Sequence, residues 1–188
     1  ERGSVHGGRR VQPSGAPISG GNGGDAGMIA PVPAAYFYTP INDDMHFGMS
    51  LSVPFGFKSE YERDWVGRYD GVTTDLKAID LGAAFSYDVN PYVSFGASVF
   101  VEHLTIELSN AVDFGTIAYA ASNGASAQLG LFPGSADGFA TVEGDNNAFG
   151  YTLGTTLSPS EDTNIAFSYR SKVEHKITGG KATFDVPA

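Results

Sequence analysis

The sequence predicts an all-β fold, an antiparallel β-barrel whose strands cross a membrane. Glycine supplies 25 of the 188 residues, aromatic residues make up 12%, and charged residues only 17%. This composition is common in β proteins that have many tight turns. From residue 29 onward apolar residues alternate with small or polar ones, as they do in strands with one apolar face. Because little helix-forming sequence is available to cover those faces, lipid is the simplest cover.

Composition also argues against several other classes. A net charge of −10 disfavours binding to nucleic acid, which needs clustered Lys and Arg. Without cysteine, the chain offers no disulfide framework and no thiolate metal site. Its apolar runs are too short for a transmembrane helix, although barrel strands are shorter still. The first fifteen residues lack the apolar core of a signal peptide, so we expect an exported protein to begin upstream of this chain.

The first clear strand pattern lies in residues 47–61. Apolar residues occupy every second position from Phe47 to Phe55. Pro54 and Gly56 then interrupt the run, since proline removes a ladder hydrogen bond and glycine weakens a strand. We therefore expect a kink at this point.

Four later segments alternate in the same way, namely 76–89, 92–108, 148–157 and 164–177. In 92–108 the apolar set changes from odd to even positions, which predicts a β-bulge near Glu102–His103. The last segment is predicted to be one regular strand through residue 176. The total of about six strands is below the eight that a closed outer-membrane barrel needs. The chain is therefore expected to be part of a larger barrel.

The connections between these strands differ in length. Residues 40–44, 88–91 and 158–163 are short and contain Pro, Asn, Asp and Ser, the usual turn residues. Residues 57–75 and 110–140 are long, and this alternation is the layout of outer-membrane barrels, with long loops outside the cell. Aromatic residues near the short turns would suit a lipid–water interface; they are Tyr36, Tyr38, Phe47, Tyr87 and Tyr92. A soluble β-sandwich with an aromatic core remains the alternative.

The sequence contains no convincing catalytic or metal-binding motif. His46, His103 and His175 fall on three predicted strands without ligand spacing. Residues 143–147 lack the spacing and terminal Glu of a calcium loop, so a polar turn is expected there. No nucleophile elbow is present. We predict neither an enzyme nor a cofactor.

Longer stretches of the chain resemble a known family. These are PVPAAYFYTPINDD, the run from GMSLSVPFGF through WVGRY and TTDLK to SYDVN, EGDNNAFGYTLG and IAFSYRSKV. Together they are similar to the outer-membrane long-chain fatty acid transporters, the FadL family, which includes importers of aromatic hydrocarbons. The resemblance covers roughly residues 25–185 and makes residues 1–28 a Gly-rich, disordered segment and 29–188 a partial barrel.

The resemblance implies a fourteen-stranded barrel, plugged by an N-terminal hatch, that imports hydrophobic molecules without energy coupling. Cargo would first bind in a groove among the outer loops, then enter an inner pocket, and finally leave sideways beside a kink in the third strand. Residues 29–39 would be the second strand and 45–56 the third. The kink then falls on Pro54, Phe55 and Gly56, as a lateral gate.

The chain departs from the family pattern in two respects. The hatch, with its Asn-Pro-Ala motif, has no match here, and strands after about residue 180 are absent. Asn110 stands where the family can place a basic residue near the cargo's head group. The preference between a fatty acid carboxylate and a neutral hydrocarbon is therefore open.

The loop at 110–140 supplies most of the candidate ligand-binding residues. Its large apolar side chains suggest a binding surface, or else a small core within the loop; they are Phe114, Ile117, Tyr119, Leu129, Leu131 and Phe132. Arg170 and Lys172 are candidates for an anionic head group, with Glu174 as a possible structural partner. Lys58, Arg63 and Arg68 would meet a carboxylate or lipopolysaccharide phosphate. Alternatively, neighbouring acidic residues neutralise them, and these are Glu60, Glu62, Asp64 and Asp70.

The leading functional hypothesis is passive import of fatty acids or other hydrophobic small molecules across the outer membrane of a Gram-negative bacterium. The expected partners are these molecules, membrane lipid and lipopolysaccharide, and the protein is expected to be a monomer. The alternatives are a nonspecific diffusion porin, a soluble β-sandwich binding module and an outer-membrane hydrolase. An open polar pore would conduct ions, a sandwich would need no detergent, and a hydrolase would cleave ester substrates.

Overall fold

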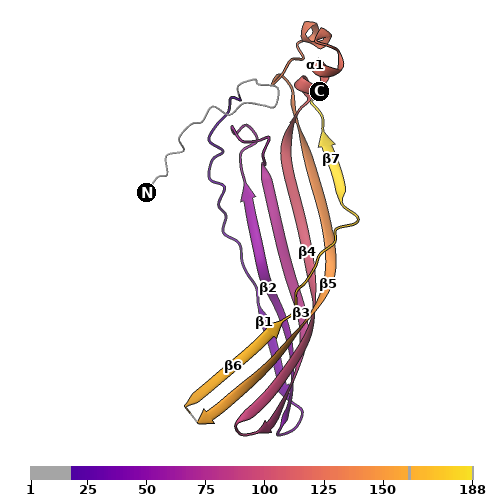
Figure 1. The fold of residues 1–188 in the computed structure, drawn as a ribbon. Coiled ribbons are helices and arrows are strands. Elements are labelled where there is room, and N and C mark those ends of the chain that lie inside the picture. Colours follow the sequence, from indigo (N-terminus) through magenta and orange to yellow (C-terminus); the bar gives the residue numbers. More distant parts are fainter. Residues whose placement is uncertain (1–17, 161, 188) are drawn as a thin grey trace.

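The computed structural model describes residues 18–160 and 162–187, and it consists mainly of one antiparallel sheet (Figure 1). Its strands are β1 (Ala35–Pro40), β2 (Met45–Glu60), β3 (Thr73–Asn90), β4 (Val93–Asp113), β5 (Asp137–Ser160), β6 (Thr163–Arg170) and β7 (Lys181–Asp185). They follow the order β1-β2-β3-β4-β5-β6, and β7 pairs with the upper part of β5. Helix α1 (Phe114–Ala121) and the 3-10 helix η1 (Ala125–Leu129) lie between β4 and β5. The all-β prediction is confirmed.

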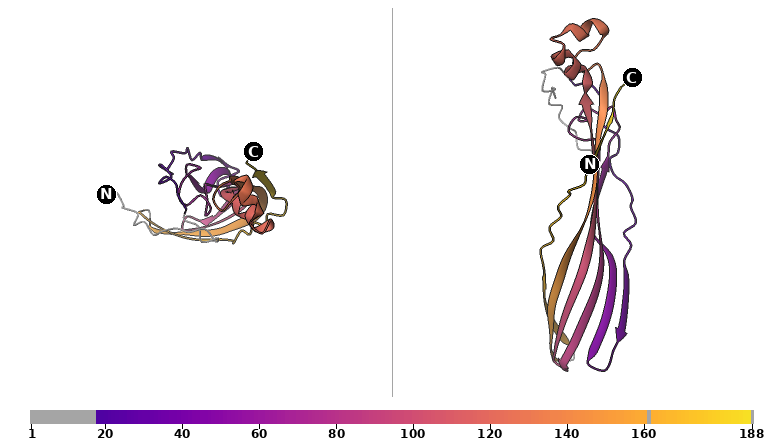
Figure 2. Two further views of the ribbon diagram at one scale, coloured as in Figure 1. Left: turned by 90° about the horizontal axis from the view of Figure 1, so that it is seen from above. Right: turned by 90° about the vertical axis from the view of Figure 1, so that its right-hand side faces the viewer.

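The sheet is curved and does not close on itself (Figure 2). Short turns join the strands at one end, and the two long connections lie at the other end (Figure 1). The first turn is held by Asn42, whose side chain accepts hydrogen bonds from the backbone N–H groups of Asp44 and Met45, at 3.0 and 2.8 Å. Asn90 likewise accepts from the N–H of Tyr92 at 2.8 Å. These side chains satisfy turn backbone that the ladders leave unpaired. Among the described residues, no helix is long and apolar enough to cross a membrane.

The two faces of the sheet differ in chemistry. Residues directly opposite each other in an antiparallel pair share a face, so the register assigns every ladder position. The outer face carries Leu81, Val101 and Phe149, and the inner face carries Asp80, Glu102 and Ala148. Below this level the outer face exposes large apolar side chains, among them Phe85, Tyr87, Phe95, Val99 and Leu153.

This apolar outer band has the height of a bilayer. It extends from Leu81 to Asn90 on β3 and from Val93 to Val101 on β4, close to the roughly 9–11 residues that a tilted strand needs to cross a membrane. However, β3, β4 and β5 contain 18, 21 and 24 residues. Their upper parts therefore project beyond the bilayer on the side of the long loops.

The bulge predicted near Glu102–His103 is wrong. β4 keeps an unbroken register with β5 from Val93 to Asp113 and with β3 through the same region. The apolar residues of β4 change from odd to even positions because the strand leaves the bilayer. Beyond the bilayer its outer face meets water. Leu104, Ile106 and Leu108 lie on the inner face, whereas Glu107 lies on the outer one, as the register shows.

The polar turn predicted at 143–147 is also wrong, since these residues lie inside β5. Glu143 is opposite Glu107, and Asn147 is opposite His103, both on the outer face above the apolar band. The segment is polar because it is outside the bilayer. It does not mark a chain reversal.

The regular strand expected over 164–176 ends at Arg170. Residues 171–180, which we call the strap, belong to no strand and lead to β7 (Figure 1). Two rings of the proposed aromatic girdle are also misplaced. Tyr36 and Tyr38 are opposite Ser50 and Gly48 on the inner face, while Phe47 and Tyr87 point outward.

Candidate functional site

The kink that Pro54 and Gly56 predict is present in β2. Its register with β3 shifts between Ser52, opposite Asp80, and Phe55, opposite Ala78. Three steps along β2 therefore match two along β3, which is a β-bulge at Val53–Pro54. A bulge reverses the alternation of a strand. Residues of β2 below it point outward at odd positions, whereas Phe55 and the following odd residue, Phe57, point inward beside Ala78 and Leu76.

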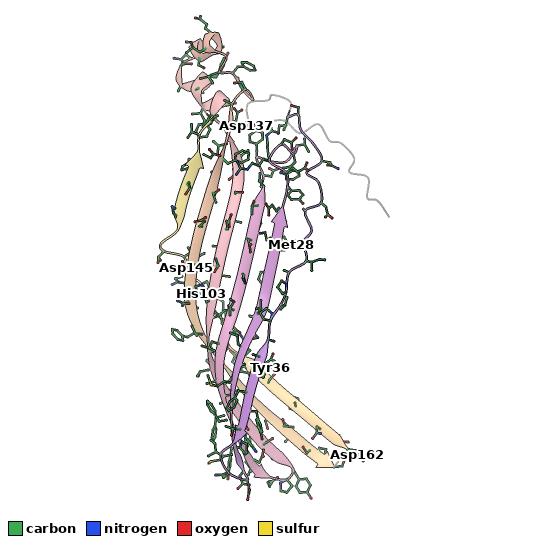
Figure 3. The ribbon with its side chains drawn as sticks, turned by 180° about the vertical axis from the view of Figure 1, so that it is seen from behind. Met28, Tyr36, His103, Asp137, Asp145 and Asp162 are labelled. Carbon is green, nitrogen blue, oxygen red and sulfur yellow. The ribbon has the colours of Figure 1, made fainter. Side chains whose placement is uncertain are left out.

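The wall is also open beside this bulge. β1 pairs with β2 only up to Ala35, opposite Leu51. Above that level the preceding residues, from Met28 onward, run beside β2 without joining its ladder (Figure 3). No backbone hydrogen bond within the described ranges 18–160 and 162–187 links residues 52–60 to them. The edge of β2 is thus unpaired from the bulge upward.

The inner face above the bulge is apolar. Its side chains come from four neighbouring strands, because the ladders place them opposite one another; they are Phe55, Phe57, Leu76, Ala78, Leu104, Ile106, Leu108 and Val142. Ala78 is only 3% exposed, so these residues already bury part of the surface. An apolar wall of this kind binds apolar molecules without hydrogen-bond specificity.

A group of charged and polar side chains lies directly below the apolar wall. We call Asp80, Glu102, Arg170 and His175 the ionic cluster. The Nη2 atom of Arg170 is 2.5 Å from Oδ2 of Asp80 and 3.7 Å from Oε2 of Glu102. Nε2 of His175 lies 2.8 Å from Oε1 of Glu102. The side chains of Asp80 and Glu102 are 5% and 14% exposed, so the cluster holds its carboxylates away from water.

Phe100 packs beneath the cluster. The guanidinium of Arg170 lies 3.6 Å from the centroid of its ring, a favourable cation–π distance. The ring occupies the space above Gly150, where an added Cβ would be 2.2 Å from Cζ of Phe100. Phe100 is 5% exposed. Glycine at position 150 thus lets a buried ring lie flat on β5 and support Arg170.

Below Phe100 the inner face is lined by small residues. They surround a hollow of about 310 Å³, and those from the strands include Gly48, Ala84, Ser98, Thr152 and Gly154. Tyr38 and His46 close one side, with their rings stacked 5.4 Å apart. The inner face therefore changes from apolar, to ionic, to small residues along its height.

The long loop after β4 is anchored by Asp113. Its carboxylate accepts hydrogen bonds from the N–H of Thr116 at 2.8 Å and of Gly134 at 2.9 Å, so it caps α1 and ties the start of the loop to its end. Of the predicted ligand residues, Phe114 packs on Gly138 and the ring of Tyr119 contacts Gly124. The others are largely exposed: Ile117 at 52%, Leu129 at 82%, Leu131 at 37% and Phe132 at 52%.

The three cations that the sequence placed in the first long connection, Lys58, Arg63 and Arg68, all form ion pairs. Nε of Arg68 is 2.7 Å from Asp137, and its Nη1 donates to the carbonyl of Ser19 at 2.8 Å. Tyr69 donates to the other oxygen of Asp137 at 2.5 Å, and burial together with this bond raises the pKa of the Tyr69 hydroxyl. The remaining two cations approach distant carboxylates: Lys58 lies 3.5 Å from Asp75, and Arg63 lies 3.5 Å from Asp185. Of the acidic neighbours expected to neutralise these cations, Glu60 does lie 3.7 Å from Lys58, at the end of β2. Sequence reasoning missed the other partners, since they belong to other strands.

The remaining predicted residues fall at separate places. Asn110 is opposite Ala140 on the inner face near the top of β4. Lys172 lies in the strap and pairs with Glu174, away from Arg170.

Residues 18–27 of the Gly-rich segment bind along the first loop, as in the bond from the N–H of Val66 to the carbonyl of Gly21 at 3.0 Å. Residues 1–17 of that segment lie outside the described residues. In the described part of the chain, no cluster of three or more His, Asp or Glu residues is arranged to hold a metal ion.

Comparison with known proteins places this geometry in a family. The family model described as "Outer membrane protein transport protein (OMPP1/FadL/TodX)" matches residues 4–187. A long-chain fatty acid transport protein of Salmonella typhi is 30% identical over 87% of this chain and 38% of its own. Outer membrane protein P1 of Haemophilus influenzae is 28% identical over 88% of this chain and 39% of its own. The crystal structure of a Pseudomonas aeruginosa FadL homologue superposes with a TM-score of 0.69 and 26% identity, covering 85% of this chain and 38% of that one. The chain thus spans well under half the length of these relatives.

Proposed function

Because the chain belongs to the outer membrane protein transport family (OMPP1/FadL/TodX), we propose that it forms the part of a barrel wall through which hydrophobic small molecules enter a Gram-negative cell passively. Members of the family are outer-membrane proteins that transport hydrophobic substrates. The specific proposal is that cargo follows the apolar inner wall downward and leaves sideways beside the bulge of β2.

One observation carries this proposal, namely the position of the bulge. It turns Phe55 and Phe57 inward at the level where the edge of β2 loses its partner. This edge begins at the upper boundary of the apolar band, where head groups, water or an inner cavity can satisfy its unpaired backbone groups. An apolar surface that leads to an unpaired edge thus provides a continuous path from the upper inner face to the membrane.

The ionic cluster supports the sideways direction. A hydrophobic molecule moving straight down would have to pass Arg170 above Phe100 and displace groups that Asp80 and Glu102 hold. Leaving a carboxylate of this cluster buried without Arg170 costs about 2–3 kcal/mol, because the half-exposed Arg170 reduces the full cost of breaking a buried pair. The open edge of β2 begins at the same level, at Ser52 opposite Asp80. A molecule that leaves past this edge does not have to separate any of these charges.

The chemistry of the cargo follows from the same residues. Arg170 is held by two carboxylates, and Asn110 on the inner face is neutral. A carboxylate head group would thus compete with Asp80 for Arg170. We infer that the wall favours the hydrocarbon part of its cargo, so that neutral hydrophobic molecules and long-chain fatty acids both qualify. The exposed apolar residues of the loop after β4 would provide the first capture surface.

Deleting Pro54 tests the exit. Ser52 and Phe55 are opposite Asp80 and Ala78, so removing one intervening residue restores a regular ladder and keeps Phe55 pointing inward. In the full-length protein, we expect uptake of a radiolabelled hydrophobic substrate by cells to slow severalfold while loop binding is kept.

Pro54→Val is the matched control, because it keeps the extra residue and therefore the bulge. It should transport close to the parent rate. A deletion variant that assembles normally and imports as fast as the parent would leave the bulge as simple curvature of the barrel. Ion conductance through the parent barrel in planar bilayers would instead favour a diffusion porin.

A further inference from the structure

β5 has a second interruption that the proposed function does not use. On the side away from β4, β6 pairs with it only between Thr152 and Ser160, and β7 only between Phe139 and Glu143. Between them, the described residues form one ladder-like link, at Tyr151, whose carbonyl accepts from the N–H of Ser171 and whose N–H donates to the Ser171 hydroxyl, both at 2.9 Å. Residues 144–150 of β5 thus face the strap and not a strand.

Contacts on the inner face hold the strap against β4 and β5. His175 reaches Glu102 on β4 at 2.8 Å. Ile177 lies over Gly144, where an added Cβ would be 2.6 Å from its Cγ2. Asn146 donates to the carbonyl of Lys176 at 2.9 Å, which fixes the strap at its middle. With His175 and Ile177 turned inward, the strap blocks the gap from the inside.

A polar hollow of about 560 Å³ lies between the edge of β5 and the strap. Its walls are Asn146, Asn147, Ala148 and Phe149 of β5 and Lys172, Glu174 and Lys176 of the strap. Lys172 forms an ion pair with Glu174. Within 18–160 and 162–187, Lys176 makes no ion pair. The lining of the hollow thus holds two lysines and one glutamate, whereas Asp145, the next residue along β5, is outside that lining.

Backbone groups of β5 also line this side. Tyr151 directs its N–H and carbonyl toward the strap, and in a strand every second residue does the same. The N–H and carbonyl groups of Phe149 and Asn147 thus face this side, and among the described residues they find no backbone partner there, which leaves the N–H groups available to an anion. Free N–H groups beside a lysine form a site for an anion.

The hollow lies at the boundary of the apolar band. Phe149, 81% exposed, is the last large apolar residue on the outer face of β5, and Asn147, opposite His103, is the first polar one. His103 and Asp145 mark this height near the middle of the sheet (Figure 3). The long loops are above, so this is the level of the outer-leaflet head groups.

We propose that the hollow between residues 146–149 and the strap binds the phosphate group of an outer-leaflet lipid, with Lys176 and Lys172 as its cationic contacts. A phosphate has the charge and the several acceptor oxygens that two lysines and adjacent N–H groups satisfy. The hollow is polar, and its strap residues Lys172, Glu174 and Lys176 alternate with His175 and Ile177, which turn toward the inner face. A phosphate head group therefore fits the hollow better than the carboxylate of transported cargo does.

Lipid binding to the full-length protein in detergent tests the site. Lipid A with both phosphates is titrated against the parent, and bound lipid is measured by native mass spectrometry. Lys176→Gln should weaken binding about tenfold, the size of one lost charge-assisted contact, and adding Lys172→Gln should weaken it further. Lys181→Gln removes an exposed lysine of β7 outside the hollow, so it should leave the affinity unchanged.

Three further arms identify the ligand. Dephosphorylated lipid A should bind the parent as weakly as lipid A binds the double variant, and laurate should bind parent and double variant alike. Millimolar inorganic phosphate should fail to displace lipid A. If the parent and Lys176→Gln bind lipid A equally, the proposed site is wrong. If the variants lose affinity for laurate alone, the hollow binds transported cargo. If inorganic phosphate displaces lipid A, the ligand of the hollow is a free anion and not a lipid. Assembly of each variant is verified by heat-modifiable gel migration. If the double variant fails to assemble, the proposal is judged on the single Lys176→Gln variant, which breaks no ion pair.

Discussion

Replacing Arg170 by Gln separates two roles for this side chain. The structure pairs its guanidinium with Asp80 at 2.5 Å, whereas the sequence suggested that it holds an anionic head group. Oδ1 of Asp80 is already buried without a hydrogen bond to any described residue. In Arg170→Gln the whole carboxylate would lose its charge partner in a site that is 5% exposed.

The size of the effect follows from this burial. Breaking a buried ion pair by removing one partner costs about 3–5 kcal/mol. Arg170 is itself 46% exposed, so water partly screens the pair and we expect about 2–3 kcal/mol. Asp80→Asn in the same chain removes the stranded charge and should recover most of this loss. In contrast, Lys172→Gln breaks an exposed pair with Glu174 and should cost less than about 1 kcal/mol.

The measurement is urea unfolding of the full-length protein in phospholipid vesicles, followed by tryptophan fluorescence. The four points of the Arg170 and Asp80 cycle give the coupling energy directly. Affinity for laurate is measured on the same samples. If Arg170→Gln leaves the free energy of unfolding unchanged and instead lowers laurate affinity, the structural role is refuted and the head-group role is supported.

Two further predictions concern packing and capture. Gly150→Ala places a Cβ 2.2 Å from Phe100 and should destabilise the barrel by about 1–3 kcal/mol. Gly56→Ala is its control, because a Cβ at that position meets no atom within 4 Å. Equal urea midpoints for the two variants would contradict the close packing of Phe100 on Gly150. The triple change Ile117→Ser, Leu129→Ser and Phe132→Ser should weaken capture of a hydrophobic ligand severalfold without affecting assembly. Unchanged ligand affinity in detergent would show that these exposed residues serve only the loop.

Local patterns predicted the features that depend on local chemistry. The turn residues located the three short connections, and Pro54 located the bulge of β2 because it cannot donate to a ladder. The apolar alternation identified the outer face wherever the strand is within the bilayer. The same rule failed for β4 near Glu102 and for residues 143–147, since it assumes that one face is apolar along the whole strand. There the solvent changes along the strand and the backbone stays regular.

The strap could not be predicted from its own residues. Residues 171–176 alternate as a strand does, yet His175 binds Glu102, which is 73 positions away in the sequence. Arg68 gave the same difficulty, because Asp137 is 69 positions from it. Ion pairs between distant strands depend on register, and register requires the complete order of the sheet.

The two interruptions of the wall lie at one height, and a common cause explains this. Ser52, directly before the bulge of β2, is opposite Asp80. Asp80 is opposite Glu102, and Glu102 is opposite Ala148 inside the unpaired stretch of β5. Within the apolar band, an unpaired N–H or carbonyl would face hydrocarbon and cost several kcal/mol. Just above it, water, head groups or an inner cavity can satisfy such groups. The boundary of the bilayer is therefore the lowest level at which a barrel can open its wall sideways, toward cargo at β2 and, in our proposal, toward a lipid phosphate at β5.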